Sequence, residues 1–208
     1  MAGSDDSVAR GKAAALRHDR FNLVFICPII ALTGLSLLKS SDRQAGVHAA
    51  LSWTTLGYIV ADICYNALVP HCQPSKVRLG TILFHHLVTC WLVWHPIQHR
   101  ADSGHITAYG TIVEVNTLFQ TLHKVFRLKI FQQGFLASWV SMRLVWYPYC
   151  VWLSHLHMLT LDHLPGSYTY CQVVGSQFTL VCLNFFWSAE FLMGGKKKSG
   201  TSKTVKDE

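Results

Sequence analysis

Six long apolar stretches follow one another along the chain, separated by short polar connections. They cover residues 21–38, 48–70, 79–96, 104–123, 130 to about 156, and 170–194. An α-helix needs about 20 mostly apolar residues to cross the hydrocarbon core of a bilayer, and each stretch comes close to that length. The pattern therefore predicts an all-α polytopic membrane protein with six transmembrane helices.

The segments that flank these stretches are polar. We expect residues 1–20 to form a cytosolic N-terminal arm, residues 21–194 a single transmembrane domain, and residues 195–208 a basic, disordered cytosolic tail. Neither flank is expected to carry the chemistry. The first stretch is too long for the apolar region of a signal peptide and has no small-residue cleavage site after it, so it should remain as the first span.

Composition and charge agree with a membrane protein. Of the 208 residues 50% are hydrophobic and 14% are charged, against roughly 25% charged in soluble domains. Most Lys and Arg residues precede the first stretch or follow the second, fourth and sixth, and such an excess marks the cytosolic side. Both termini are therefore predicted to be cytosolic. This asymmetry accounts for the net charge of +7 without nucleic acid. Lys206, third from the end, favours the endoplasmic reticulum.

Ionisable residues inside the apolar stretches are the main functional signal. Those that form the candidate site are Asp62, the adjacent pair His85 and His86, Glu114, and Arg143. A charged or titratable side chain is costly in a membrane, so a functional site is the default explanation. With a rise of about 1.5 Å per residue, Asp62, His86 and Glu114 lie roughly 10–15 Å from the cytosolic ends of their helices. These three spans are expected to meet at one depth, around a partly polar, partly aromatic interior.

The residue types in this layer suit proton transfer or acyl transfer. An imidazole has a pKa of about 6.5, and a nearby carboxylate fixes its tautomer. Neighbouring residues on a helix point about 100° apart, so one histidine of the pair can face the cavity while the other packs. The candidate catalytic residues are His85, His86, Asp62 and Glu114. If they are catalytic, acyl-CoA is the expected co-substrate, and no other cofactor is expected.

A metal site is not expected. Di-iron lipid enzymes need clustered HxxxH and HxxHH motifs, whereas the one HxxxH here, His95 to His99, contains a proline. A further group lies on or near the non-cytosolic side, and its histidines are expected to be solvated in loops, with a weak metal site as the alternative: His99, His105, His155, His157, Asp162 and His163. The seven cysteines form no CxxC motif, and we expect them to be small buried apolar residues.

Four residues are candidates for lipid binding: Arg143, Asn184, Trp187 and Tyr58. Two interpretations of Arg143 stay open at this point. It either neutralises Asp62 or Glu114 as a buried counter-ion, or it binds the head group of an anionic lipid or acyl carrier. Asn184 is also suited to hydrogen bonding between helices.

The order of these motifs resembles the TLC-domain superfamily over roughly residues 20–195. The motifs are YIVADICYNAL, ILFHHLVT, GTIVEVNTLF, MRLVWYP and LNFFW, in successive spans. The resemblance implies a six-helix bundle around a lipid-accessible cavity. Ceramide synthases carry a second His-Asp pair ahead of the acid, and ITAYGTIV (106–113) has neither residue. The chain therefore looks closer to the small branch of the superfamily.

The sequence thus predicts a protein that binds a membrane lipid or fatty-acyl chain and influences membrane lipid composition, with or without acyl transfer. The alternative is a non-enzymatic cargo receptor of the endoplasmic reticulum, or a translocon-associated protein with protein clients. Catalysis and oligomeric state are left open by the sequence.

Overall fold

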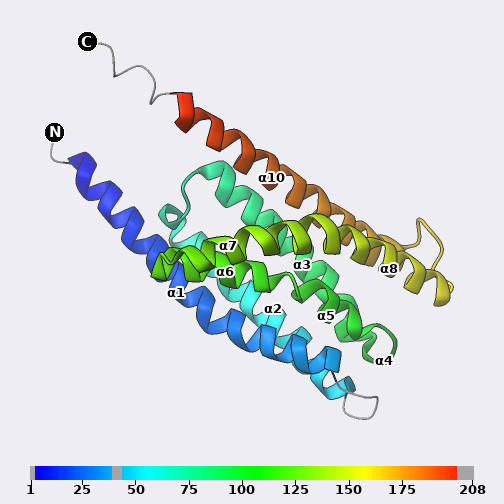
Figure 1. The fold of residues 1–208 in the computed structure, drawn as a ribbon. Coiled ribbons are helices and arrows are strands. Elements are labelled where there is room, and N and C mark those ends of the chain that lie inside the picture. Colours follow the sequence, from blue (N-terminus) through cyan, green and yellow to red (C-terminus); the bar gives the residue numbers. More distant parts are fainter. Residues whose placement is uncertain (1–2, 39–43, 201–208) are drawn as a thin grey trace.

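Six helical rods follow one another in the computed structural model, which describes residues 3–38 and 44–200 (Figure 1). The first three are α1 (Gly3–Leu38), α2 (Gln44–Leu68) and α3 (Lys76–Gln98). The fourth comprises α4 (Arg100–Ser103), α5 (His105–Thr111) and α6 (Glu114–Phe126). The fifth comprises α7 (Lys129–Ser138), η3 (Trp139–Trp146) and α8 (Tyr147–Thr160), and the sixth α9 (Tyr168–Tyr170), η4 (Cys171–Gly175) and α10 (Ser176–Gly200). Each predicted stretch corresponds to one rod, so the all-helical, six-helix prediction is confirmed.

The rods form a closed ring. α1 packs against α2, α2 against α3, α3 against α10, α10 against η3 and α8, α7 against α6, and α6 back against α1. The start of α1 and the end of α10 lie at the same end of this bundle, which we call the terminal end (Figure 1). The short helix η2 (Pro70–Cys72) and the turn between α6 and α7 lie there as well. The opposite end is called the far end.

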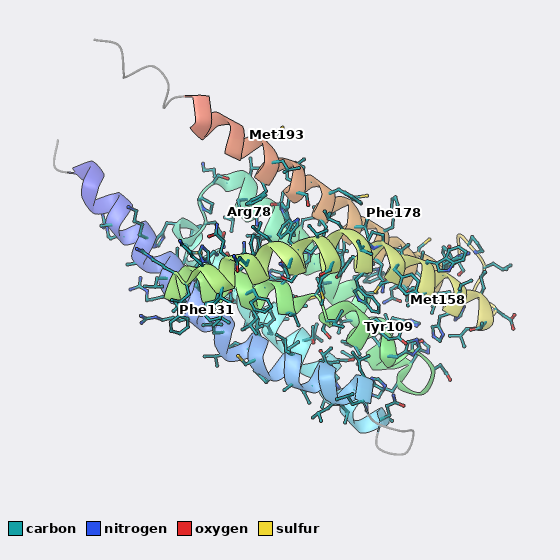
Figure 2. The ribbon with its side chains drawn as sticks, in the orientation of Figure 1. Arg78, Tyr109, Phe131, Met158, Phe178 and Met193 are labelled. Carbon is teal, nitrogen blue, oxygen red and sulfur yellow. The ribbon has the colours of Figure 1, made fainter. Side chains whose placement is uncertain are left out.

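Apolar side chains cover the outside of the bundle, while its polar side chains turn inward. On α3, Phe84, Leu87 and Trp91 are exposed, whereas His86 is buried. Phe178 and Met193 of α10 are also exposed at the outer surface (Figure 2). This arrangement suits a lipid environment, in which an apolar exterior carries no penalty.

Two helices of the described part satisfy a length-and-hydropathy test for membrane spans on their own: 9–38 and Lys76–Gln98. The other rods carry many polar residues or are divided into shorter segments. The fourth rod, for example, is interrupted at Ile112 and Val113, and α6 begins immediately afterwards with Glu114.

The fifth rod widens into a π-helix over η3, just before Pro148. A proline ring clashes with the carbonyl group four residues earlier and removes one hydrogen-bond donor, so a regular helix cannot continue unchanged. The amide of Tyr147 instead reaches back five residues to the carbonyl of Met142. π-helical turns are frequent at functional sites, and this one contains Arg143.

The far end is held by a packed histidine network. His95 is 1% exposed, and Ser103 joins its Nε2 (3.1 Å) to Nε2 of His157 (3.3 Å). The rings of His105 and His157 lie 4.5 Å apart, and the hydroxyl of Tyr170 is 2.8 Å from Nδ1 of His155. The expectation that His105, His155 and His157 are solvated is therefore wrong, because the rods converge at this end and pack them. No group of metal-binding residues suited to an ion occurs within the described ranges.

The flanks also differ from the sequence-based picture. α1 is one continuous helix from Gly3, so most of the predicted arm belongs to the first rod. α10 continues to Gly200, past the predicted span end at 194, and so the predicted disorder does not apply to 195–200. Residues 201–208 of the predicted tail lie outside the described residues. The helical hydrogen bonding of α1 thus begins before the first apolar stretch, and that of α10 continues after the last one.

Candidate functional site

A cavity of about 810 Å³ occupies the middle of the ring. On α3 its lining runs from Arg78 to Pro96, which corresponds to about 27 Å of helix rise. That length approaches the roughly 30 Å thickness of a bilayer core. All eight residues proposed from the sequence line this cavity: Tyr58, Asp62, His85, His86, Glu114, Arg143, Asn184 and Trp187. Their hydrogen-bond partners differ from one residue to the next.

Asp62 of α2 lies between two imidazoles. Its Oδ1 is 2.5 Å from Nε2 of His18 on α1, and its Oδ2 is 2.5 Å from Nε2 of His86 on α3. The side-chain amide of Asn66 donates to Oδ2 (3.0 Å). Asp62 is 2% exposed. One buried carboxylate therefore connects the first three rods.

The donor roles in this group follow from the carboxylate. An ionised carboxylate has acceptors only, so both Nε2 atoms carry hydrogen and donate to Asp62. Nδ1 of His86 is buried and makes no hydrogen bond with the described residues. His86 is thus committed to Asp62 and has no second nitrogen open to the cavity. We assign it mainly to holding α2 and α3 together.

His18 is the residue that the sequence analysis missed. It is 8% exposed, and its ring stacks on Tyr65 at 4.9 Å. It lies in the segment expected to be a cytosolic arm, but the structure buries it against Asp62. A signal was present: Ala14, His18 and Asn22 are spaced by one helical turn and continue the inner face of the first span toward the N-terminus.

His85 points to another side of α3 than its neighbour. Its ring centroid is 5.4 Å from the ring of Trp187 on α10, and 5.5 Å from that of His86. Nδ1 of His85 is buried without a hydrogen bond, and its Nε2 makes no hydrogen bond within the described residues either. His85 lines the cavity. It is therefore the histidine of the pair that is available to a bound molecule.

Trp187 forms the wall beside His85. Its indole N–H donates to the hydroxyl of Thr81 (3.3 Å), and the guanidinium of Arg78 lies 4.8 Å from its ring centroid. Arg78 also approaches Glu190 of α10 at 3.7 Å. These contacts between α3 and α10 hold the indole against the cavity. Trp187 is buried, with 6% of its surface exposed.

Arg143 reaches into the cavity from the π-helix η3. Its Nε donates to Oδ1 of Asn116 (2.7 Å), one Nη to Oδ1 of Asn184 (3.0 Å), and the other to the hydroxyl of Thr117 (3.1 Å). Its guanidinium lies 5.1 Å from the ring of Trp139. Among the described residues no carboxylate lies within ion-pair distance of it. Direct neutralisation of Asp62 by Arg143 is therefore excluded, because Asp62 is occupied by His18 and His86.

Glu114 lines the cavity from the first turn of α6. The positive end of the helix dipole favours a carboxylate at such a position. Within the described part of the chain Glu114 makes neither a hydrogen bond nor an ion pair. Its oxygens thus remain free to accept a hydrogen bond from a bound molecule. Tyr58 of α2 donates its hydroxyl to Oδ1 of Asn22 (3.3 Å).

The loop between α2 and α3 lines the cavity at the terminal end. The Gln73 amide donates to Oδ1 of Asn66 (2.7 Å), and the Cys72 thiol is 3.6 Å from the same oxygen. Burial raises the pKa of the Cys72 thiol, which keeps it protonated and able to donate. Through Asn66 this loop is connected to Asp62. Lys124 and Asp19, paired at 3.0 Å, line the same end.

The fold and the cavity define a polytopic membrane protein with polar chemistry enclosed by six helical rods. The family model of the TLC domain matches residues 22–193, which is most of the chain. The chain therefore belongs to the TLC domain family, a family of integral membrane proteins linked to lipid sensing and lipid metabolism. The comparison does not resolve a branch within the family. Searches of curated proteins and of solved structures return no match.

Proposed function

We propose that the cavity binds a single lipid or acyl chain and that the protein thereby influences membrane lipid composition. One observation carries this proposal. A polar layer, with His85, Glu114 and Arg143, and an apolar section share one continuous cavity inside the bundle. An amphiphilic molecule matches that division, with its head group in the polar layer and its chain in the apolar section.

The apolar section lies toward the far end. It is lined by Ile59 of α2, Leu92 and Val93 of α3, Ile106 of α5, and Val113. Most of these side chains belong to the two buried apolar clusters that hold the bundle together. The hydrocarbon chain of a bound lipid that lies along these side chains exchanges its contacts with neighbouring lipid tails for contacts with the packed protein. The polar layer then holds the head group near the level of His85.

Acyl transfer is the reaction that the free imidazole supports. In this reaction Nε2 of His85 takes the proton from a hydroxyl or amine of the acceptor lipid while that oxygen or nitrogen attacks an acyl thioester. The new bond joins the acceptor atom to the acyl carbon, and the carbon–sulfur bond breaks. The thiol then leaves with the proton that His85 held. Acyl-CoA would supply the thioester, and Glu114 would orient the acceptor through its free oxygens.

Lipidomics of cells with altered protein tests both parts of the proposal. We expect His85→Ala to reproduce the lipid profile of cells lacking the protein, at unchanged protein level, because the base is lost while the fold is kept. His99→Ala, an exposed histidine outside the cavity, is the matched control and should match wild type. A wild-type profile for His85→Ala would overturn the catalytic role.

A wild-type profile in cells lacking the protein would overturn the lipid proposal altogether. The non-enzymatic alternative, a cargo receptor or translocon-associated protein, would then take its place. Capture of client proteins by the full-length chain, unchanged by His85→Ala, would support that alternative.

We further propose that the protein resides in the endoplasmic reticulum with its terminal end in the cytosol. Support comes from the basic residues of this end, such as Lys12, Arg20 and Arg127. In sealed microsomes we expect a membrane-impermeant maleimide to label Arg127→Cys directly, and Arg100→Cys only after permeabilisation. The reverse pattern, compared with the wild-type background, would contradict the orientation.

A further inference from the structure

We propose that the head group bound in the cavity is an oxyanion, a carboxylate or phosphate on a single hydrocarbon chain, and that Arg143 is the residue that binds it. This inference rests on the proposed lipid-binding function and specifies the class of ligand. It follows from how Arg143 is held, from the charges around it, and from the shape of the cavity beyond it.

The protein positions Arg143 without neutralising it. A guanidinium has five N–H donors, and three of them bond to Asn116, Asn184 and Thr117, one on each nitrogen. All three acceptors are neutral. The two terminal nitrogens thus each keep one further N–H. A planar fork of this kind suits both oxygens of a carboxylate or phosphate.

Several of the other charged groups that line the cavity have partners of their own. Lys124 pairs with Asp19 at 3.0 Å, and Asp62 accepts from two imidazoles. Glu114 lines the same cavity and its charge attracts Arg143, but the two make no hydrogen bond or ion pair among the described contacts. An unpaired cation inside a membrane bundle is costly. A bound anion would remove that cost and complete the donor set of Arg143.

The cavity continues past this level, which distinguishes a lipid anion from a free one. Thr89, Leu92, Val93 and Pro96 of α3 line it successively toward the far end. A free phosphate would use the guanidinium and leave this section without an occupant. An anion with a hydrocarbon chain uses both. The ring of Trp139 beside the guanidinium also limits the space for bulky head groups.

Direct binding to the purified full-length protein in nanodiscs of zwitterionic lipid tests the inference. The probes are palmitate, hexadecyl phosphate, hexadecanol and inorganic phosphate, each measured by displacement of a fluorescent fatty acid. We expect the two anionic amphiphiles to bind at least about tenfold more tightly than hexadecanol, which corresponds to one charge-assisted hydrogen bond. This comparison needs no variant, so a folding defect cannot obscure it.

Variants then assign the preference to Arg143. Arg143→Gln should bring the anions to the affinity of hexadecanol, and Arg143→Lys should retain part of the preference because it keeps the charge without the fork. Arg20→Gln removes an exposed cation at the terminal end of the bundle and should leave the preference intact.

Three outcomes would overturn the inference in distinguishable ways. Equal binding of anions and hexadecanol to wild type would refute the oxyanion while leaving the lipid cavity standing. Binding of none of the amphiphiles would refute the cavity proposal as well. If inorganic phosphate displaced the fluorescent fatty acid at the same concentrations as hexadecyl phosphate, the hydrocarbon chain would contribute nothing to binding. The site would then be one for a free anion.

Discussion

At the scale of single residues, the two adjacent histidines of α3 have different environments. His86 donates to a carboxylate that is also bound by His18, and its other ring nitrogen is buried. His85 packs beside Trp187, and its Nε2 makes no hydrogen bond within the described residues. The helical rotation of about 100° between neighbours produces this division. Loss of His86 is therefore expected to affect the fold, and loss of His85 the function.

His18→Ala is expected to lower the free energy of unfolding by about 1–3 kcal/mol, because a buried carboxylate loses one of its donors. The acceptor is charged, so the loss should exceed the roughly 0.6 kcal/mol average of hydrogen bonds between membrane helices. Thermal melting of the protein in detergent measures the change. Arg17→Ala, at an exposed neighbouring position, is the control. Equal melting of the two variants would show that His18 does not stabilise Asp62.

At the scale of helices, irregular segments position the polar side chains. The break before α6 places Glu114 at a helix start, and the π-helix η3 carries Arg143 toward α6 and α10. Close packing of α6 and α7 fixes the same region, because Asn116 also donates to Ser138 Oγ at 3.0 Å. A Cβ atom at Gly134 of α7 would lie 2.7 Å from the ring of Phe119. The absence of a side chain at Gly134 therefore permits this contact.

Substitution of glycine by alanine should have opposite effects at two positions. Gly134→Ala should destabilise the protein by about 1–3 kcal/mol, because the Phe119 ring must move. Gly80→Ala, with no atom within 4 Å of its Cβ, should stabilise it by roughly 0.5–1 kcal/mol. Melting temperatures in detergent compare the two. If Phe119→Ala fails to rescue Gly134→Ala, the contact between α6 and α7 is not the cause.

At the scale of the whole molecule, the ring of rods divides its interior into two parts. Apolar clusters and the histidine network fill the far half, while the cavity extends from the terminal end into that packed region. Gly110 of α5 lines the cavity and has nothing within 4 Å of its Cβ position. A larger side chain there would occupy space that a ligand chain can use.

Gly110→Leu should shift binding toward shorter acyl chains, because its side chain fills part of the apolar section. Competition with fatty acids of increasing length measures the profile. Gly80→Leu adds the same side chain at an exposed position of α3 and serves as the control. An unchanged chain-length profile for Gly110→Leu would show that the chain does not lie past this position.

The number of rods and the eight cavity residues were predictable from the sequence. Polar side chains within apolar spans face the interior of a membrane bundle, because exposure to lipid is costly. The partner of each residue was not predictable. Asp62 bonds to His18 because α1 extends beyond the apolar stretch that defined the first span. Arg143 bonds to Asn116 and Asn184 because the π-helix changes its direction. A hydropathy pattern predicts neither the extension of a helix into polar sequence nor a local change of helical pitch.

The three neutral partners of Arg143 also bear on the order in which the chain is made. An arginine at the centre of a membrane helix costs about 2.5–3.5 kcal/mol at insertion. Asn116 and Thr117 are already synthesised when Arg143 enters the membrane, but Asn184 belongs to α10, the last rod to emerge. The fifth rod therefore reaches its final hydrogen bonding only after the ribosome has completed the sixth. A nascent chain that stops before Asn184 therefore leaves one N–H of Arg143 without its partner.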